Sequence, residues 1–293
     1  MLGQLHLEPT SHYYISQRLK LHYVDWGNSD KPLLVLVHGG SDHARTWDWV
    51  AQALRDDYHV IALDLRGHGD SEWALGSRYT MLEYVTDLAQ LLTQIDSFPV
   101  TLIGHSIGGA VVLQYSGVCS DNVANVVAIE GLGPPLNQHQ AQKNPVQDQI
   151  RGWITQMRNL AKRKRRRYTT LNEAAQRMRE VNTRLSEEQA HHLAFHGTNR
   201  DEDGMYVWKF DSYVNARSPY PSRAESTLDI WSLITCPALL IRGGDSNVPD
   251  LETDERLQSF QNAQTKTIPD AGHRVHHDQL EHLLQVVQGF LSI

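Results

Sequence analysis

The residues with the clearest chemical potential form the sequence GHSIGG at residues 104–109. This sequence follows a short apolar run at residues 100–103 and precedes a helix-compatible stretch at residues 109–118. A serine on a sharp turn between a strand and a helix needs small residues two positions before and after it, because larger side chains would collide with neighbouring backbone. Gly104 and Gly108 meet this requirement. The pattern predicts that Ser106 is a nucleophile, with the N-terminus of the next helix aimed at any anion that forms.

The elements that would position this serine alternate along the chain. Short runs rich in Val, Ile and Leu are typical of strands buried on both faces of a parallel sheet, and they occur at residues 33–37, 60–63, 100–103, 126–129 and 238–241. Helical patterns lie between or after them, at residues 44–54, 81–95, 109–118 and 276–291. Residues 13–17 and 20–25 are expected to form an antiparallel hairpin on one edge. We therefore predict an α/β fold with a mostly parallel central sheet and helices on both faces.

The alternation stops after Gly133. The chain is then polar, with helical stretches near residues 146–167, 171–182 and 186–195, and strands are expected to resume only after Pro237. A helical block between two strands is most simply an inserted cap over the carboxyl edge of the sheet, where ligand sites form in α/β proteins. We predict a core at residues 1–135 and 223–293, with a helical cap insertion at residues 136–222.

The order of four motifs resembles the α/β-hydrolase superfamily. They are HGG at residues 38–40, DLRGHG at 64–69, GHSIGG at 104–109 and AGH at 271–273. The cap sequences DGMYVW at 203–208 and SPY at 218–220 resemble the capped, cofactor-free serine-hydrolase-like or carboxylesterase group. The resemblance implies an α/β-hydrolase fold and places the catalytic histidine at His273, in a loop between a last strand at 265–268 and the final helix. A base of this kind is required because serine alone is a weak nucleophile.

The acid that orients this histidine is open between two residues. The imidazole needs a carboxylate on its second nitrogen, and the family usually supplies it from the loop after the strand at 238–241. By spacing from Gly243, the usual aspartate position holds Ser246, with Asp245 one residue early. Some family members carry the acid at the earlier strand end, where Glu130 follows residues 126–129. We favour Glu130 and keep Asp245 as the alternative.

The oxyanion hole requires two backbone donors. We expect them to be the N–H groups of Ile107, directly after the serine, and Gly40 in the HGG motif, with Ser41 as a possible neighbouring donor. His38 and His105 are expected to brace the loops near the site.

Composition indicates no nucleic-acid or membrane partner. The 27 Lys and Arg residues against 34 Asp and Glu residues give a formal net charge of −7. The basic run at residues 162–167 is expected to be a solvated part of a cap helix, and binding of an anionic substrate, an acidic partner or nucleic acid by this run is the alternative. His192 and His196 stand one helical turn apart, but no third ligand is evident, so we expect no metal. With two cysteines and no apolar leader, the sequence predicts a cytoplasmic protein. Its oligomeric state is expected to be a monomer or a homodimer.

The sequence therefore predicts a hydrolase that cleaves a small carboxylic ester through an acyl-enzyme on Ser106, without any cofactor. The same residues suit hydrolysis of carbon–carbon, thioester or lactone bonds. A ligand-binding or signalling protein that retains the fold is the alternative from a different class.

Overall fold

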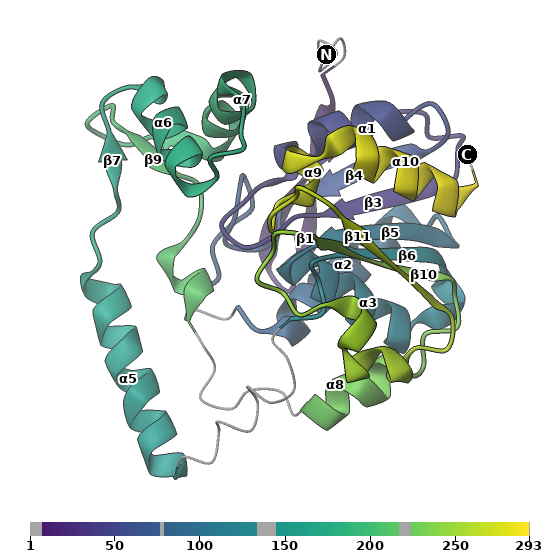
Figure 1. The fold of residues 1–293 in the computed structure, drawn as a ribbon. Helices are drawn as coiled ribbons and strands as arrows, with labels where there is room; N and C mark the ends of the chain where they lie inside the picture. Colours follow the sequence, from purple (N-terminus) through teal and green to yellow (C-terminus); the bar gives the residue numbers. More distant parts are fainter. Residues whose placement is uncertain (1–7, 77–78, 134–144, 217–223, 293) are drawn as a thin grey trace.

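The computed structural model describes residues 8–76, 79–133, 145–216 and 224–292, and these contain a large, mostly parallel sheet (Figure 1). Its strand order is β1-β2-β4-β3-β5-β6-β10-β11. The strands are β1 (Thr10–Ser16), β2 (Leu19–Asp25), β3 (Leu33–Val37), β4 (His59–Leu63), β5 (Val100–His105), β6 (Val123–Ile129), β10 (Ala238–Gly243) and β11 (Ala263–Ile268). The strands from β4 to β11 in this order pair in parallel, and the β1–β2 hairpin joins β4 antiparallel at one edge. The predicted fold class and edge hairpin are confirmed.

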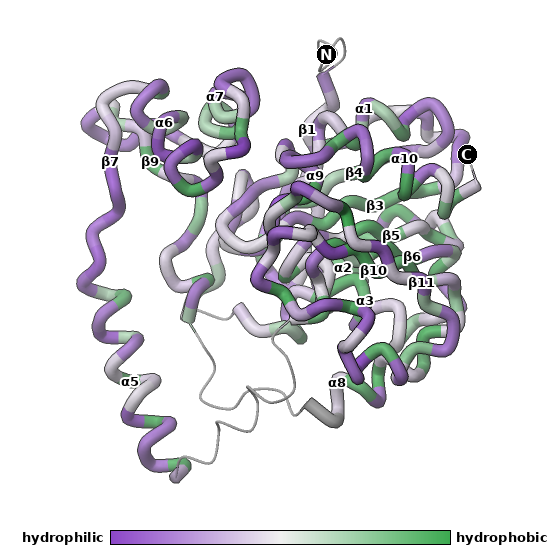
Figure 2. The backbone as a smooth tube through the Cα atoms, in the orientation of Figure 1, coloured by the Kyte–Doolittle hydropathy of each residue, from purple (hydrophilic) through white to green (hydrophobic). Residues whose placement is uncertain are grey.

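Both faces of the sheet are covered. In β3, Leu33, Val35 and Val37 pack into one apolar cluster with residues of α2 and α3, whereas Leu34 and Leu36 pack into a second cluster with residues of α1 and α10. Successive side chains of a strand point to opposite faces. Burial of both faces therefore explains why these strands read as unbroken apolar runs rather than as alternating patterns. Figure 2 shows these strands as the most hydrophobic part of the chain.

The helices of this part of the chain follow the predicted ranges with differences in extent, and one helix, at Ala224–Trp231, was not predicted. They are α1 (Asp48–Leu54), α2 (Met81–Ile95), α3 (Ile107–Val118), α8 (Ala224–Trp231), α9 (Val275–Asp278) and α10 (Leu280–Leu291). Short 3-10 turns are η1 (Ala44–Trp47), η2 (Ser120–Asn122), η4 (Ser212–Asn215), η5 (Leu251–Thr253) and η6 (Glu255–Ser259). The expected helix at 44–54 begins as η1, and the expected helix at 276–291 is divided at Gln279, whose backbone is not helical (φ −141°, ψ 58°).

Residues 145–216, which we call the cap segment, lie between β6 and β10 and stand beside the main sheet (Figure 1). They form α5 (Val146–Lys162), β7 (Arg167–Tyr168), α6 (Leu171–Val181), α7 (Glu187–Gly197), β8 (Thr198–Arg200) and β9 (Tyr206–Trp208). The short strands make a second sheet, in the order β7-β9-β8, which was not predicted from the sequence. Its strands are two or three residues long, too short for a recognisable period.

Residues 163–167 of the basic run are not helical, so the expected place of the run within a cap helix is wrong for all but Lys162. Helix α5 ends at Lys162, and the run continues as an extended segment into β7. Consecutive cations would place like charges three and four positions apart on a helix, where they repel one another. Arg167 instead pairs with Asp201 and Asp203 (2.7 Å between Nε and the Asp201 carboxylate).

Other predictions concern residues outside the described ranges. The proposed boundaries at 135/136 and 222/223, and the SPY motif at 218–220, lie there. Within the described ranges, no helix is both long and apolar enough to cross a bilayer.

Gly108 provides a test of the tight packing beneath the predicted nucleophile. A Cβ at Gly108 would lie 2.5 Å from the His38 carbonyl oxygen and would also strike that of Val37. We expect Gly108→Ala to lower the free energy of unfolding by about 1–3 kcal/mol, the usual cost of overpacking. The measurement is urea denaturation followed by circular dichroism.

Gly152→Ala is the matched control for this substitution. Gly152 lies in α5 with no heavy atom within 4 Å of its added Cβ, and alanine favours an exposed helix by about 0.5–1 kcal/mol. Equal stability changes in the two variants would contradict the packing argument.

Candidate active site

Ser106 lies at the junction of β5 and α3, as the motif predicts. Its backbone has φ 54° and ψ −118°, a conformation that a non-glycine residue adopts only under constraint. The close approach of β5 to α3 provides that constraint, because Gly104 packs directly against the backbone of Gly108. The Ser106 N–H donates to the carbonyl of Ile129 at the end of β6, at 2.9 Å. The side chain is therefore presented at the carboxyl edge of the sheet and is partly exposed.

His273 lies in the loop between β11 and α9, beside this turn. Its carbonyl accepts a hydrogen bond from His105 Nε2 at 2.8 Å, and the centroids of the two rings are 4.8 Å apart. His105 directly precedes Ser106, so this contact ties the histidine loop to the serine turn. His105 thus braces a loop of the site, as expected. The side chain of His273 is 48% exposed and is accessible to a ligand.

Glu130 follows β6 and brings a buried carboxylate to His273. The side chain has no solvent exposure, and Oε2 lies 2.9 Å from His273 Nδ1. The carboxylate also accepts hydrogen bonds from the Gly243 N–H at 2.7 Å and from the Ser246 hydroxyl. Because β6 and β10 are neighbours in the sheet, the end of β6 supplies the carboxylate, and the end of β10 and the loop after it supply its donors.

Asp245 has a different environment. Its carboxylate pairs with Arg184 at 2.7 Å, and its side chain is 51% exposed. Among the described residues, none of its contacts is with His273. The structure thus brings Glu130, and not Asp245, to the candidate base. Ser246, at the family's usual acid position, donates to Glu130, a role that the sequence analysis did not assign.

The loop after β3 approaches the serine from the other side. A Cβ at Gly39 would lie 2.7 Å from His105 Nδ1 and 3.3 Å from Ser106 Cβ, so only glycine fits there. Gly40 is exposed, with open space around it. His38 holds this loop by accepting a hydrogen bond from the Leu65 N–H at 3.0 Å. Ile107 is the first residue of α3, where backbone N–H groups lack partners within the helix.

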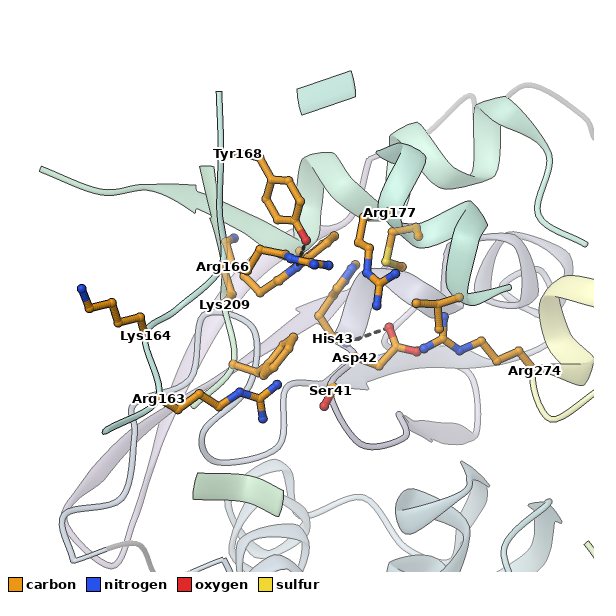
Figure 3. Close-up of a pocket in the computed structure, with 15 residues that line it drawn as sticks. Ser41, Asp42, His43, Arg163, Lys164, Arg166, Tyr168, Arg177, Lys209 and Arg274 are labelled. Carbon is orange, nitrogen blue, oxygen red and sulfur yellow. Dashed lines mark hydrogen bonds between the residues drawn. The ribbon is translucent and has the colours of Figure 1, made fainter. Parts of the chain in front are cut away.

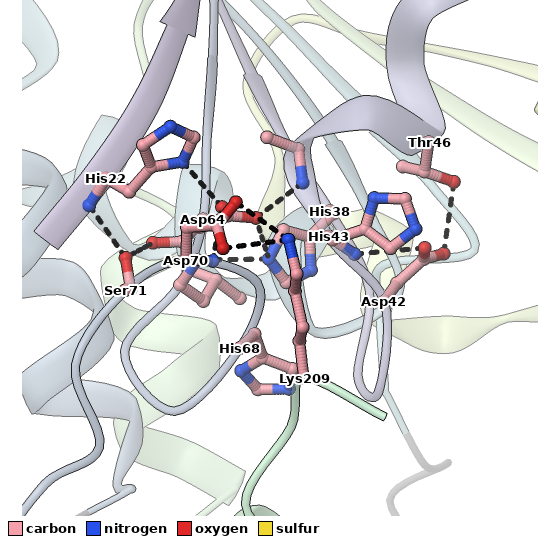
Figure 4. Close-up of polar contacts among 12 residues, drawn as sticks. His22, His38, Asp42, His43, Thr46, Asp64, His68, Asp70, Ser71 and Lys209 are labelled. Carbon is pink, nitrogen blue, oxygen red and sulfur yellow. Dashed lines mark hydrogen bonds and ion pairs between the residues drawn. The ribbon is translucent and has the colours of Figure 1, made fainter. Parts of the chain in front are cut away.

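A buried polar network fixes the same loop to the DLRGHG segment (Figure 4). The Asp64 carboxylate accepts hydrogen bonds from the backbone N–H groups of Ala44 at 2.6 Å and Asp70 at 2.9 Å, and lies 2.7 Å from His22 Nδ1. Burial alone would raise the pKa of this carboxyl. The hydrogen bond and charge of His22 outweigh burial and hold the pKa of Asp64 well below its usual range. The network stabilises the loops on which Gly40 and Ser41 lie.

Asp42 and several histidines form a second buried group near the site. Although burial opposes ionisation, the charges of Arg274 and His43 lower the pKa of Asp42 to about 2. Burial lowers the pKa values of His105, His276 and His277 well below 6.5. At neutral pH this group therefore combines an ionised Asp42 carboxylate with uncharged imidazoles at His105, His276 and His277.

Side chains of metal-binding type approach one another outside the serine site. Asp48, on α1, lies 3.0 Å from His192, whose ring is 4.5 Å from that of His196. Asp48 is therefore a third side chain of metal-binding type beside the two histidines, and it could not be identified from the sequence. However, the Arg45 guanidinium already contacts the same Asp48 oxygen at 2.6 Å, and its positive charge opposes a cation there. The expected absence of a metal stays a prediction.

Comparisons with known proteins agree with this architecture. A sequence profile described as the alpha/beta hydrolase family matches residues 34–284. The chain is 28% identical to Esterase Rv0045c of Mycobacterium tuberculosis and 25% identical to a serine hydrolase-like protein of Danio rerio. These alignments cover 91% of this chain and 85% and 83% of the two relatives. A thioesterase domain from the curacin biosynthetic pathway superposes with a TM-score of 0.84 at 21% identity, over 98% of this chain and all of that domain.

Because burial lowers the pKa values of several histidines, we expect the free energy of unfolding to depend on pH. His68 is a suitable residue for testing this expectation. Burial, followed by the charge of His38, lowers the pKa of His68 to about 3. The unfolded chain binds a proton near pH 6.5, which the native state does not take up until about pH 3. The stabilisation is therefore complete above pH 6.5 and declines as the pH falls toward 3, by at most about 1.4 kcal/mol per pH unit.

We expect His68→Gln to reduce the slope of unfolding free energy against pH by about 1 kcal/mol per unit between pH 6 and 4. Urea denaturation at a series of pH values measures this slope. His191→Gln, on the exposed surface of α7, serves as the control and should leave the slope unchanged. Identical slopes for His68→Gln and the unsubstituted protein would show that the pKa of His68 is not lowered in the native state.

Proposed function

Because this chain belongs to the alpha/beta hydrolase family and is distantly related to esterases, we propose that it is a serine hydrolase that cleaves a small carboxylic ester. Ser106 is the nucleophile, His273 the general base and Glu130 the acid that orients His273. The observation that carries this proposal is the 2.9 Å contact between the buried Glu130 carboxylate and His273 Nδ1, on a loop joined to the serine turn through His105.

The contact determines the form of the imidazole. A proton on Nδ1 donates to Glu130, which leaves Nε2 unprotonated and able to accept a proton from the Ser106 hydroxyl. The buried carboxylate then stabilises the imidazolium that results. Serine, rather than a carboxylate, at this position argues against the chemistry of dehalogenases and epoxide hydrolases, which use a carboxylate nucleophile.

The reaction proceeds in two half-reactions. In the first, Ser106 Oγ bonds to the ester carbonyl carbon as its proton passes to His273 Nε2. The tetrahedral intermediate then expels the alcohol, which takes that proton. In the second, water gives a proton to His273 and bonds to the acyl carbon, and the carboxylic acid leaves as Ser106 regains the proton. The N–H groups of Ile107 and Gly40 stabilise the negative oxygen in both intermediates.

The nucleophile is tested by replacing Ser106 with alanine. We expect Ser106→Ala to lower kcat for p-nitrophenyl esters by about 10⁶-fold, the scale seen when a triad nucleophile is removed. Its folding should be unchanged, because the turn is held by its glycines. The measurement is hydrolysis of p-nitrophenyl acetate, butyrate and octanoate, together with labelling by a fluorophosphonate probe. A folded, unsubstituted protein that neither hydrolyses these esters nor reacts with the probe would point to a binding protein instead.

The acid is tested by two separate substitutions. We expect Glu130→Gln to lower kcat by about 10⁴-fold, because the amide cannot stabilise the imidazolium and favours the wrong tautomer. Asp245→Asn should change kcat by less than about fivefold, since it removes only an exposed ion pair with Arg184. Measuring kcat of both variants on one ester distinguishes Glu130 from Asp245 as the acid. A larger loss of kcat in Asp245→Asn would identify Asp245 as the acid.

A further inference from the structure

A cavity of about 480 Å³ lies between the cap segment and the loop after β3 (Figure 3). This is the size of a pocket for a small organic ligand. Cationic side chains dominate its polar lining, and they are Arg163, Lys164, Arg166, Arg177, Lys209 and Arg274. Asp42 is the single carboxylate among the described lining residues. Such a concentration of one charge is unexpected in a chain whose formal net charge is −7.

The cavity adjoins the proposed catalytic residues, although Ser106 is not among its described lining residues. Arg274 directly follows His273. Ser41 lines the cavity and stands two residues after Gly39, which packs against Ser106. Two residues span at most about 8 Å of chain. The cavity therefore begins within about 8 Å of a residue that packs against Ser106, a distance that a small substrate can bridge.

Some of the cavity's cations already have partners. Lys209 pairs with Asp70 at 2.8 Å, Arg177 with Glu180 at 2.9 Å, and the charge of Arg274 acts on Asp42. These contacts compensate part of the positive charge.

The basic run supplies the cations that lack such compensation. Arg167 is neutralised by two aspartates, and Arg165 donates to the Trp208 carbonyl and lies over the Trp73 ring. In contrast, no described carboxylate pairs with Arg163 or Arg166. Figure 3 shows Arg163 extending toward Ser41, with Arg177 approaching Asp42 from the opposite side.

The remaining lining is apolar and aromatic. Met178, Val181, Trp208 and Phe210 contribute to the wall, and Trp208 is held in place by a hydrogen bond from its indole N–H to the Tyr168 hydroxyl at 3.1 Å. A second cavity of about 200 Å³ shares Ser41, Trp208 and Phe210 with the first. A lining that combines apolar and cationic side chains suits a ligand with a hydrocarbon linker and a charged end.

We propose that this cavity binds an anionic group of the substrate, a carboxylate or a phosphate, with Arg163 and Arg166 as its principal ligands. The substrate class is thus an ester that carries a negative charge a short linker away from the scissile carbonyl. This inference rests on the proposed function and narrows it. Guanidinium groups match the geometry of carboxylate and phosphate oxygens, which explains arginine at both positions.

The test compares charged and neutral esters of matched size. On the acyl side, p-nitrophenyl hydrogen glutarate is compared with its methyl ester and with p-nitrophenyl 4-phosphonobutanoate. On the alcohol side, 4-carboxyphenyl butanoate is compared with its methyl ester. We expect kcat/KM for the charged member of at least one series to exceed that of its neutral partner by about tenfold, as a few favourable charge contacts would provide. The glutarate and phosphonate arms distinguish a carboxylate from a phosphate ligand.

Variants connect this preference to the cavity. The double variant Arg163→Gln/Arg166→Gln should lower kcat/KM for the preferred charged ester about tenfold, mainly by raising KM. Its kcat/KM for the neutral ester should stay within about twofold of that of the unsubstituted protein. Lys162→Gln is the matched control, because Lys162 belongs to the same basic run but does not line the cavity. Salt at 0.5 M should weaken the preference in the unsubstituted protein.

The outcomes separate the two proposals. Hydrolysis of neutral esters without a preference for the charged ones, or a preference that survives the double substitution, would overturn the anion site and leave the serine hydrolase intact. Absence of all hydrolysis, together with no labelling of Ser106, would overturn the proposed function and the inference with it. A preference lost equally in Lys162→Gln would show that overall charge, rather than this cavity, selects the substrate.

Discussion

The positive φ of Ser106 is the constraint around which the rest of the site is organised. A residue held in such a conformation costs of order 1–3 kcal/mol and persists only where surrounding structure over-determines it. Here the Ser106 N–H donates to the carbonyl of Ile129 at the end of β6. Glu130, which follows Ile129, donates its own N–H to the carbonyl of Ile241 in β10. Glu130 also has a positive φ of 55°. The strained turn and the buried carboxylate are therefore joined through successive hydrogen bonds at the ends of three adjacent strands, so the sheet edge that holds one also positions the other.

This arrangement explains which features the sequence could predict. The turn at Ser106 depends on glycines within a few positions, so the local pattern was sufficient, and the strands buried on both faces were evident from unbroken apolar runs. The choice between Glu130 and Asp245 depends on the neighbouring positions of β6 and β10, whose residues are more than a hundred positions apart. Loop spacing alone could not show that Ser246 would donate to a carboxylate from another strand. The small cap sheet was missed because its strands are too short to show a period.

The basic run illustrates the same limit in electrostatic terms. In the sequence it is one block of charge, for which a solvated helix was the simplest expectation. In the structure its members have separate environments, because β7 turns Arg167 toward Asp201 and Asp203 and the preceding extended segment places Arg163 beside the loop after β3. An extended backbone points successive side chains in different directions. If the run were treated as a helix, the position of Arg163 and Arg166 at the cavity could not be predicted.

Polar contacts join the cap segment to the loop after β3, to α1 and to α9. His43 Nε2 lies 3.1 Å from the Leu193 carbonyl, His192 lies 3.0 Å from Asp48, and Asn182 donates to Asp278 at 2.8 Å. Hydrogen bonds are directional, whereas apolar contact is not, so these contacts fix the orientation of α6 and α7 rather than merely their proximity. Arg177 belongs to α6, and β9 leads directly to Lys209. The contacts that hold the cap segment in place therefore also help to place Arg177 and Lys209 at the cavity. The ends of β5 and β6 supply the serine and the carboxylate, and the loop after β11 supplies the histidine.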